Sequence, residues 1–452
     1  MTRVGIVGGG VSGLMAAWEL SELGFEVELF EAAPVLGGLA SSFDFDGFRI
    51  ERFYHFICKT DETLIRTIGR LGLADQLHWK QTRTGFFYEG EHFPFSHGLD
   101  VLRFSPLSWP EKLRFALGVY RASRRSDWHS LESQPAKQWL IDTLGPKAYE
   151  VIWDPLLRIK FDRYHDDISA AWMWHRIHRV ARSRPSPFSG EKFGYLSGGS
   201  DLLVGTLSER TKAKGGKIHL STRVEAITAD GDRCTGLRVA GEHREFDAVI
   251  CALPLTIVPE LLPTGAPEYR AALEKLESIG VVCMILRLRH PLTNDFWLNV
   301  NDQRISFNGV IQYSHLNDDP RLEGRTIAYI PFYLDRGHPR FQYSDELLYD
   351  EYCTALSILN PDFDRNWVEG YRVFRAPHAQ PICGLDFSSQ VPRIRTPWDH
   401  LYMIESTQLY PADRIISGNL RLAQDAVAIA LAEMGYTGRL PFPQRDPSDI
   451  PA

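Results

Sequence analysis

The amino-acid sequence predicts an α/β fold in which three separated segments of a 452-residue chain build one parallel sheet. Three observations favour this fold. Residues 3–31 have the pattern of a strand, a tight glycine-rich turn, a helix and a second strand. Residues 217–254 are rich in strand patterns, and residues 400–435 have the pattern of a strand, a polar loop and an amphipathic helix over about 420–434. The two blocks between these segments differ from them in composition and residue pattern. We therefore expect two insertions that together form a second domain.

The overall composition is that of an ordinary globular protein. Hydrophobic residues make up 44% and charged residues 24%, which suffices for a large core. The net charge of −7 argues against a general nucleic-acid binder. No stretch of the sequence reaches about 18 consecutive apolar residues, so we expect no membrane span. The six cysteines show no C-x-x-C pair and the N-terminus no cleavage site, so we expect free thiols in a reducing, cytoplasmic compartment.

The elements of the N-terminal unit follow from simple patterns. A β-branched run at 3–7 predicts the first strand, and the spacing of apolar residues predicts a helix over 11–23. Gly24 ends this helix, and residues 27–30 form the next strand. The unit is therefore a βαβ crossover, the building block of a Rossmann-like domain.

The turn inside this unit carries a dinucleotide fingerprint. Gly8-Gly9-Gly10-Val11-Ser12-Gly13 fits G-x-G-x-x-G between a strand and a helix. Gly8 permits the tight turn, Gly10 lets a pyrophosphate approach the backbone, and Gly13 allows the helix to pack closely on the sheet. The helix N-terminus presents free N–H groups to the phosphates. Glu31 follows at the end of the second strand, where a carboxylate can accept hydrogen bonds from both ribose hydroxyls.

The segment after Glu31 indicates which dinucleotide is bound. Glu31-Ala32-Ala33-Pro34-Val35-Leu36-Gly37-Gly38 resembles the flavin amine oxidase, protoporphyrinogen oxidase and phytoene desaturase superfamily. In that superfamily the Gly-Gly pair passes close to the flavin end of FAD, so the resemblance implies an FAD-binding domain. Leu39 stands where most members have arginine, which is a departure from the pattern.

The resemblance continues in order along the chain. It includes the glycine turn at 194–199, the strand 221–224 whose valine backbone holds the adenine, the strand 247–254 and the segment 375–381. Near the C-terminus a strand at 401–404 precedes a loop, and the acidic contact to the cofactor comes from Glu405 or from Asp413. The residues that fingerprint and resemblance assign to FAD are Gly8, Gly10, Val11, Ser12, Gly13, Glu31, Ala32, Gly37, Gly38, Leu39, Tyr54, Val224, Leu253, Glu405, Asp413 and Arg414. Some amine oxidases attach their flavin through a thioether to a cysteine of the C-terminal segment. No cysteine lies there in this sequence, so the resemblance implies non-covalent FAD.

The predicted fold class is thus α/β, a discontinuous Rossmann-like FAD-binding domain with an inserted, mixed α+β substrate domain. We expect the FAD-binding domain at 1–84, 191–280 and 396–440. The substrate domain would comprise a mostly helical part, 85–190, and a sheet-rich part, 281–395. Residues 441–452, which are rich in proline, are expected to be a loose tail.

The candidate catalytic residues are Arg52, His55 and Lys160. Arg52 and His55 lie in the segment 51–56, which should pass the flavin, at two positions where the more distantly related UDP-galactopyranose mutases carry histidines. A histidine beside a flavin can accept a proton or steady the reduced ring. The alternative for His55 is an ordinary core histidine.

Residues 158–184 hold seven basic residues against three aspartates. Arg158, Arg176 and Arg179 are the candidate substrate residues, and the last two share a helix face with Trp172. A basic patch in the substrate domain favours a small anionic substrate, such as a phosphate, a nucleotide sugar or a lipid-linked phosphate. The alternative is a solvated surface.

The segment 109–120 has apolar residues followed by Arg121, Arg124 and Arg125. This pattern suits either a helix buried in the substrate domain or an interfacial helix that contacts the inner face of a membrane. The sequence leaves the oligomeric state open.

These observations predict an FAD-dependent oxidoreductase that takes a hydride from a substrate C–H bond at flavin N5. A second G-x-G-x-x-G is missing, which favours a half-reaction driven by the substrate over one driven by a bound nicotinamide. The alternatives are a non-redox flavin-dependent nucleotide-sugar mutase and an FAD-binding protein without catalysis. Substrate and electron acceptor are not determined by the sequence.

Overall fold

The computed structural model describes residues 2–183 and 189–444, and the strands of the three predicted segments form one sheet in it. The sheet has the order β19-β13-β1-β2-β9, and every neighbouring pair is parallel. Its strands are β1 (Arg3–Val7), β2 (Glu26–Phe30), β9 (Lys217–His219), β13 (Ala248–Cys251) and β19 (Leu401–Met403). Because the strands are parallel, their carboxyl ends share one edge, where ligands of such sheets bind. The predicted α/β fold is confirmed.

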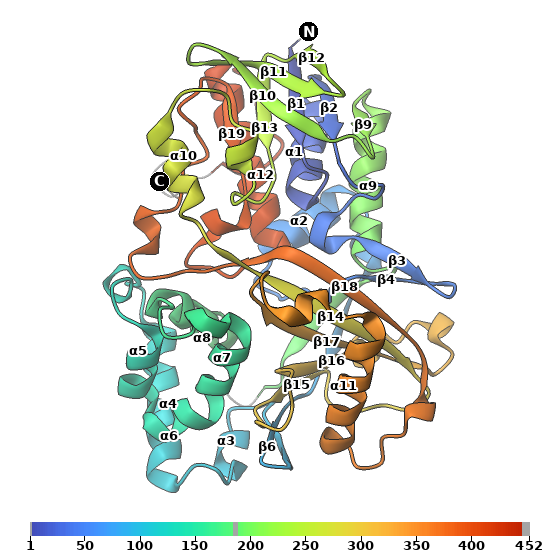
Figure 1. The fold of residues 1–452 in the computed structure, drawn as a ribbon, viewed down its shortest axis with the longest axis vertical. Coiled ribbons are helices and arrows are strands. Elements are labelled where there is room, and N and C mark those ends of the chain that lie inside the picture. Colours follow the sequence, from blue (N-terminus) through green and yellow to red (C-terminus); the bar gives the residue numbers. More distant parts are fainter. Residues whose placement is uncertain (1, 184–188, 445–452) are drawn as a thin grey trace.

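Layers of different kinds cover the two faces of this sheet. On one face α1 packs between α9 and α12, and α2 packs on α12 (Figure 1). The other face lies under a small antiparallel sheet. Leu237 of this sheet and Phe246, which directly follows it, pack on Gly5 of β1. The elements of these layers are α1 (Val11–Glu22), α2 (Glu62–Arg70), α9 (Ser200–Ala213), α12 (Ile416–Glu433), β10 (Val224–Asp230), β11 (Arg233–Val239) and β12 (Glu242–Glu245), and α10 (Pro267–Glu274) follows.

A second, seven-stranded sheet forms the centre of the other half of the molecule, in the order β18-β14-β17-β16-β15-β6-β7. Its pairs are antiparallel except β15 with β6. Its strands are β6 (Thr84–Tyr88), β7 (Glu91–Pro94), β14 (Ser278–Leu288), β15 (Trp297–Val300), β16 (Gly309–Gln312), β17 (Thr326–Leu334) and β18 (Val368–Pro381), with α11 (Asp345–Leu359) packed beside them. The block expected to be mostly helical, 85–190, thus opens with two strands of this sheet, because Phe86 and Phe93 alternate into the core.

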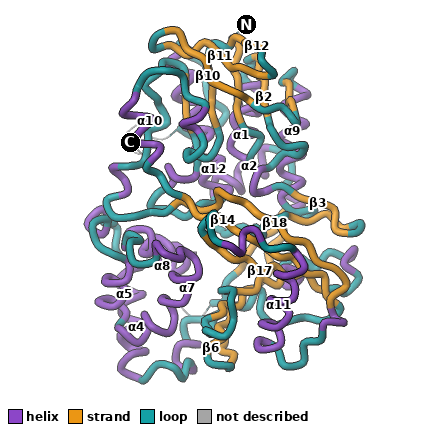
Figure 2. The backbone as a smooth tube through the Cα atoms, in the orientation of Figure 1, coloured by secondary structure: helices purple, strands orange, loops and turns teal. Residues whose placement is uncertain are grey.

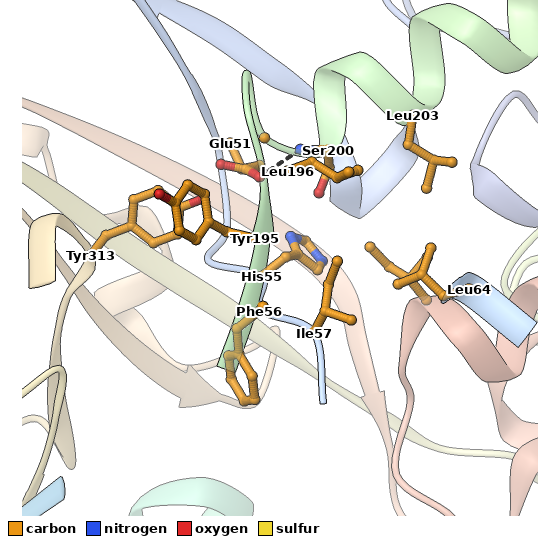
Figure 3. Close-up of a pocket in the computed structure, with 13 residues that line it drawn as sticks. Glu51, His55, Phe56, Ile57, Leu64, Tyr195, Leu196, Ser200, Leu203 and Tyr313 are labelled. Carbon is orange, nitrogen blue, oxygen red and sulfur yellow. Dashed lines mark hydrogen bonds between the residues drawn. The ribbon is translucent and has the colours of Figure 1, made fainter. Parts of the chain in front are cut away.

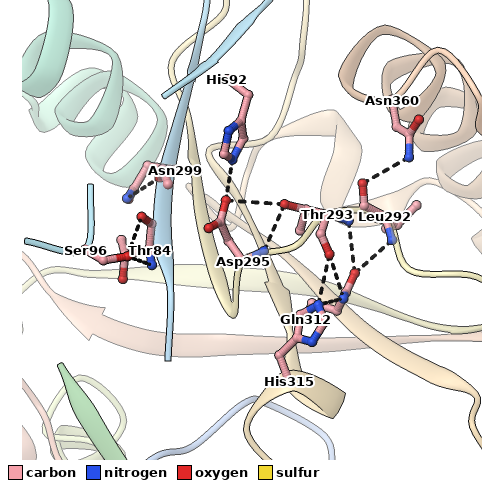
Figure 4. Close-up of polar contacts among 11 residues, drawn as sticks. Thr84, His92, Ser96, Leu292, Thr293, Asp295, Asn299, Gln312, His315 and Asn360 are labelled. Carbon is pink, nitrogen blue, oxygen red and sulfur yellow. Dashed lines mark hydrogen bonds and ion pairs between the residues drawn. The ribbon is translucent and has the colours of Figure 1, made fainter. Parts of the chain in front are cut away.

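Polar side chains hold the loop 292–295 against β6, β7 and β16 (Figure 4). Asp295 contacts His92, and the side-chain oxygen of Gln312 accepts hydrogen bonds from the N–H groups of Leu292 at 2.8 Å and Thr293 at 3.2 Å. Because Gln312 is fully buried, these bonds satisfy groups that water cannot reach. The contacts connect the N-terminal strands of the sheet to its later ones.

The remaining helices form a lobe beside the second sheet (Figure 2). They are α3 (Asp100–Arg103), α4 (Trp109–Arg124), α5 (Ala136–Leu144), α6 (Pro146–Ala148), α7 (Asp154–Phe161) and α8 (Ala170–Ser183). Helix α4 packs on α5 and α8 through Phe115, Gly118 and Ala122, which are buried. Its opposite face is open, since the side chain of Trp109 is 68% exposed. Helix α4 is therefore packed on the lobe along one face and exposed along the other.

Two short antiparallel ribbons connect the halves. They consist of β3 (Ser42–Phe45) with β4 (Phe48–Glu51), and β5 (Leu77–Gln81) with β8 (Lys192–Leu196). Among the described residues, no helix combines the length and apolarity that crossing a bilayer requires. The same part of the chain contains no group of three or more His, Cys, Asp or Glu side chains suited to a metal ion.

Three local expectations differ from the structure. Residues 221–223 are not a strand; β10 begins at Val224, because Ser221 and Thr222 instead donate hydrogen bonds to the backbone just after β2. Helix α12 begins at Ile416, earlier than the helical pattern indicated. The start of the expected tail is packed, since Phe442 is 6% exposed in the core; residues 445–452 lie outside the described residues.

Candidate active site

The glycine-rich turn has the backbone shape that a dinucleotide needs. Gly8 has a φ of +102°, a conformation that residues with a Cβ avoid. A Cβ on Gly13 would lie 1.9 Å from the carbonyl oxygen of Gly8, so only glycine fits at this position in the first turn of α1. At Gly10, by contrast, no atom lies within 4 Å of a would-be Cβ. The turn is thus closed on its protein side and open at Gly10, where a pyrophosphate would approach.

Glu31 is fixed by the turn that it faces. One of its carboxylate oxygens accepts a hydrogen bond from Gly9 N–H at 2.7 Å, and the other accepts one from Ala33 N–H at 2.7 Å. Each carboxylate oxygen can accept a second hydrogen bond, which leaves capacity for two ribose hydroxyls. Glu31 therefore both orders the turn and presents acceptors to a ligand.

The Gly-Gly pair lies directly against this turn. Gly37 N–H donates to the carbonyl oxygen of Gly9 at 2.8 Å, and Gly10 and Gly37 form an isolated parallel bridge. Both Gly37 and Gly38 have positive φ, at +106° and +57°. The two motifs form one continuous backbone cradle, and a Cβ at Gly37 would clash with the backbone of Ser41.

Other predicted FAD residues gather around the cradle. The side chain of Leu253 lies 3.0 Å from the would-be Cβ of Gly8, and Thr222 N–H, two residues before Val224, donates to the carbonyl oxygen of Glu31. The hydroxyl of Ser12 lies 3.3 Å from the side-chain oxygen of Asn419, so α1 and α12 start side by side. Ala32 follows Glu31 in the same loop, Val11 opens α1, and Leu39 packs on the core. The residues present fit a dinucleotide.

A buried group of charges lies where the helical lobe meets the loop after β19. Asp413 accepts a hydrogen bond from Arg176 of α8 at 2.8 Å, and its carboxylate lies 3.9 Å from Nζ of Lys160 of α7. Burial opposes ionisation of Asp413, but the charges of Lys160, Arg176 and Arg414 outweigh it and hold its pKa well below the usual range. Asp413 is therefore ionised at neutral pH, and we call these four residues the junction cluster.

Lys160 is the most perturbed base of the junction cluster. Its Nζ lies 5.2 Å from the ring centres of both Trp172 and Tyr333. Burial lowers the pKa of Lys160 to about 7, with Arg176 and Arg414 adding to this effect and Asp413 opposing it. An amine with such a pKa can gain or lose a proton at Nζ near neutral pH, which is typical of functional sites.

Arg414 joins the junction cluster to the second sheet. Its guanidinium donates to the hydroxyl of Tyr333 on β17 and to the side-chain oxygen of Gln380 on β18, both at 3.2 Å. Burial raises the pKa of Tyr54 well above its usual value, and the neighbouring Tyr333 adds to the shift. Tyr54, which follows the Gly-Gly loop, and the C-terminal loop thus meet at Tyr333. The junction cluster holds three cations and one carboxylate.

Arg52 and His55 have buried nitrogens with no hydrogen-bond partner, Nε of Arg52 and Nδ1 of His55. Buried polar atoms without partners indicate that something polar is missing from their surroundings. Burial and the charge of Arg414 lower the pKa of His55 to about 4, so its ring is neutral at physiological pH. His55 lines a small cavity of about 20 Å³, enough for about one water molecule. Figure 3 shows the side chains that line this cavity.

Glu51 lines the same cavity and was not singled out in the sequence. Its carboxylate accepts a hydrogen bond from Ser200 N–H at 2.7 Å, at the start of α9, and burial raises its pKa. Tyr333 and Gln380 of the second sheet were missed as well. Gln380 lies in the segment 375–381 that the family resemblance had marked, whereas nothing in the sequence separates Tyr333 from other strand tyrosines.

The three predicted substrate arginines occupy different environments. Arg176 belongs to the junction cluster, whereas Arg179 contacts Asp61 and the sulfur of Cys58, both at 3.3 Å. Arg158 pairs with Asp154 at 2.8 Å and its side chain is 54% exposed. Arg158 thus lies on the solvated surface of α7. It pairs there with Asp154, four residues earlier in the same helix.

The two candidate acidic residues are also distinct. Glu405 accepts hydrogen bonds from Ser406, from Thr407 N–H at 2.8 Å and from the Thr407 hydroxyl, so its carboxylate caps its own loop. Asp413 instead faces Lys160 and Arg176. Of the two acidic residues, Asp413 is the one with cationic neighbours.

Comparison with known proteins gives the family. Residues 11–370 match the family described as flavin-containing amine oxidoreductase. The chain is 27% identical over 318 residues to 15-cis-phytoene desaturase of Solanum lycopersicum, a match that covers 64% of this chain and 53% of that protein. The chain thus spans about half the length of the first curated relatives that it matches.

Two solved structures share the fold. An oxidoreductase from Methanosarcina mazei has a TM-score of 0.74 and 17% identity, with 94% of this chain and 100% of that chain covered. A reduced UDP-galactopyranose mutase has a TM-score of 0.73 and 16% identity, with 97% and 95% covered. The predicted resemblance is therefore confirmed, and so is the prediction of a flavoprotein oxidoreductase at the level of the family. The chain belongs to the flavin-containing amine oxidoreductase family.

Proposed function

We propose that this protein binds FAD non-covalently and oxidises a small organic substrate by removing a hydride from a C–H bond. The junction cluster is the observation that carries this proposal. In it, Lys160 and Asp413 lie 3.9 Å apart, between the five-stranded parallel sheet and the seven-stranded sheet. When bound, FAD would supply the hydride acceptor. The chain's own residues would bind, orient and handle protons.

Binding of the cofactor would fall to the glycine cradle and to Glu31. The N–H groups at the start of α1 would meet the pyrophosphate, because they have no partner within the helix. Arg52, whose Nε has no partner, and Arg414 would add positive charge toward the flavin end. The excess of cations in the junction cluster would stabilise negative charge that develops there.

Lys160 would act as the proton-handling group. With a pKa of about 7, its Nζ can accept a proton from a substrate amine or hydroxyl and return it to water. The surrounding rings of Trp172, Phe161 and Tyr333 exclude water and offer an apolar wall to the substrate.

The substrate class is narrowed by how the arginines are paired. Arg176 and Arg179 each contact a carboxylate, which offsets much of their charge. An anionic substrate would therefore be held by Arg52 and Arg414, and a substrate with an apolar body and one ionisable group fits the aromatic wall.

Anaerobic spectroscopy of the purified flavoprotein tests the proposal. The substrates to be mixed with it are phytoene in liposomes, which the desaturase relatives act on by their name, and putrescine and cyclohexylamine, after the oxidases of similar fold. Loss of the oxidised-flavin absorbance with one of them supports substrate-driven hydride removal. A chain that purifies and reconstitutes without any flavin contradicts the proposal.

A non-redox mutase acting on a nucleotide sugar is the second candidate. It is favoured by the unpartnered Nε of Arg52 together with the cation excess of the junction cluster, which would suit a diphosphate. Such an enzyme would interconvert UDP-galactopyranose and its furanose form only after the flavin is reduced with dithionite, without net oxidation. Activity of the oxidised protein on a C–H substrate excludes this candidate.

A further inference from the structure

We propose that helices α3 and α4 form a docking surface for an anionic lipid bilayer. Among the described residues, ten large hydrophobic side chains are exposed, and six of them lie within residues 99–120. The six are Leu99, Leu102, Trp109, Leu113, Leu117 and Tyr120. Singly exposed apolar residues are common on proteins, but a gathering of this kind marks an interaction site.

The exposed residues of α4 lie on one stripe. Trp109, Leu113, Leu117 and Tyr120 follow one another at spacings of four, four and three, with exposed fractions of 68%, 62%, 46% and 57%. Side chains at such spacings share one face of a helix. The opposite face, with Phe115, Gly118 and Ala122, packs on the lobe. The stripe is therefore exposed from Trp109 to Tyr120 on α4, a helix at the periphery of the molecule (Figure 1).

Helix α3 extends the stripe. The ammonium group of Lys112 donates to the carbonyl oxygen of Leu102 at 2.8 Å and lies 5.0 Å from the centre of the Trp109 ring. Lys112 thus holds the end of α3 beside the start of α4, so that Leu102 and Trp109 belong to one surface. Trp109 and Tyr120, at the two ends of the α4 stripe, are the residue types that favour the headgroup level of a bilayer.

The charge around the stripe identifies the occupant. Residues 99–125 contain six basic and two acidic residues, in a chain whose net charge is −7. Both acidic side chains are engaged locally: Asp100 accepts from His97 N–H, and Glu111 accepts from Ser108. Arg103, Arg121 and Arg124 are exposed. A second copy of this surface would bring like charges together, whereas an anionic lipid surface complements them.

Co-sedimentation of the purified, flavin-loaded full-length protein with vesicles tests this proposal. One set of vesicles contains phosphatidylcholine alone and the other also contains phosphatidylglycerol. We expect binding to the anionic vesicles that weakens as salt rises, because exposed charges are screened. The variant Arg121→Gln/Arg124→Gln should lower that binding by roughly 30-fold, from about tenfold per 1.4 kcal/mol and about 1 kcal/mol per cation.

A second variant isolates the apolar contribution. Trp109→Gln/Leu113→Gln/Leu117→Gln should lower binding on the order of 100-fold. The matched control, Leu347→Gln/Leu385→Gln, changes two leucines that are 50% and 37% exposed elsewhere and should bind like the wild type. Circular dichroism and flavin content should be unchanged in all three variants, because these side chains lie outside the cradle and the junction cluster.

Three results would overturn the proposal. They are absence of binding to either vesicle, equal binding by the triple variant and the wild type, and binding that ignores the anionic lipid. A dimer in solution that the triple variant dissociates, in a protein that leaves vesicles unbound, would assign the surface to a second copy instead.

Discussion

At the scale of single residues, Lys160 combines burial, an aromatic environment and one nearby carboxylate. Burial disfavours the ammonium form, and Asp413 restores part of it, so that the pKa of Lys160 falls to about 7. The buried rings of His55 and His175 both have their pKa lowered to about 4 and remain neutral through the same range. Lys160 is thus a group of the junction cluster whose charge changes near neutral pH.

We expect the rate of anaerobic flavin reduction to rise with pH around 7. Below this value Nζ of Lys160 carries a proton and cannot accept another; above it the amine is free. The Lys160→Met variant should lose this rise while dithionite still reduces its flavin. Asp413→Asn should move the rise to lower pH, because the Asp413 charge raises the pKa of Lys160. An unchanged pH profile in Lys160→Met would contradict the assignment.

Glu31→Ala should weaken FAD binding far more than it changes the flavin spectrum. A hydrogen bond to a charged group contributes about 1.5–3 kcal/mol, so losing it should weaken binding about 10- to 100-fold. Glu31→Gln keeps one acceptor oxygen and serves as the control with an intermediate effect. The measurement is flavin content after purification, together with the absorption spectrum. Full flavin content in Glu31→Ala would remove this role from Glu31.

At the scale of elements, the start of α1 has two glycines with opposite surroundings. Gly13 faces the carbonyl oxygen of Gly8, whereas the position of a Cβ on Gly10 is open. One glycine is needed for packing and the other for the approach of a ligand. In this one turn, Gly13 is thus required for folding, and Gly10 would be required for binding.

Gly10→Ala should fold and lose FAD, whereas Gly13→Ala should lose stability. The Gly10 methyl group would enter the space of the pyrophosphate, while the Gly13 methyl group would overlap the Gly8 oxygen and cost about 1–3 kcal/mol or more. Urea unfolding and flavin content distinguish the two effects. A stable, flavin-loaded Gly10→Ala protein would refute the placement of the pyrophosphate.

Helix α8 carries two arginines that should respond differently to the same substitution. Arg179→Gln should destabilise the fold by about 3–5 kcal/mol, because it leaves the carboxylate of Asp61, 4% exposed, without its cation. Arg176→Gln leaves Asp413 with Lys160 and Arg414, so stability should change less and the pH rise should move upward, since Arg176 lowers the pKa of Lys160. Unfolding curves and pH profiles of both variants check this. Equal loss of stability in the two variants would contradict the separate environments.

At the scale of the whole molecule, the five-stranded parallel sheet contains strands from both ends of the chain. The edge strand β19 pairs with β13, which pairs with β1, so residues 3–7 and 401–403 belong to the same layer. The glycine cradle and the C-terminal loop face the same region only because β19 joins the sheet beside β13. A ligand that contacts both would couple the two ends of the chain.

Acid precipitation should release all of the flavin. Each of the six cysteines is buried and none lies in the segment 396–440, where a thioether would be expected. Removal of the cofactor should also lower the thermal midpoint, because a ligand at 100 times its Kd stabilises by about 2.7 kcal/mol. Colour retained in the pellet, or a midpoint that ignores added FAD, would contradict reversible binding.

The sequence by itself determined those features that depend on local spacing. Strand β1, helix α1 and the carboxylate of Glu31 are fixed by neighbours within about thirty residues, and the structure places them as predicted. The separate environments of the basic residues in 158–184 could not be predicted in this way, because Arg158, Arg176 and Arg179 look alike in the sequence. Charge pattern alone gives the sign of a region and says nothing about which carboxylate each side chain meets.

Only the tertiary structure decided the chemistry of the junction cluster and the exposure of α4. Asp413 lies more than two hundred residues from Arg176 along the chain, and Tyr333 reaches Arg414 from another sheet. The shifted pKa of Lys160 arises from desolvation and from these distant charges, which exist only once the layers pack. The apolar stripe of α4 likewise has a helical pattern that a buried helix could share; packing of its other face on α8 left it facing outward.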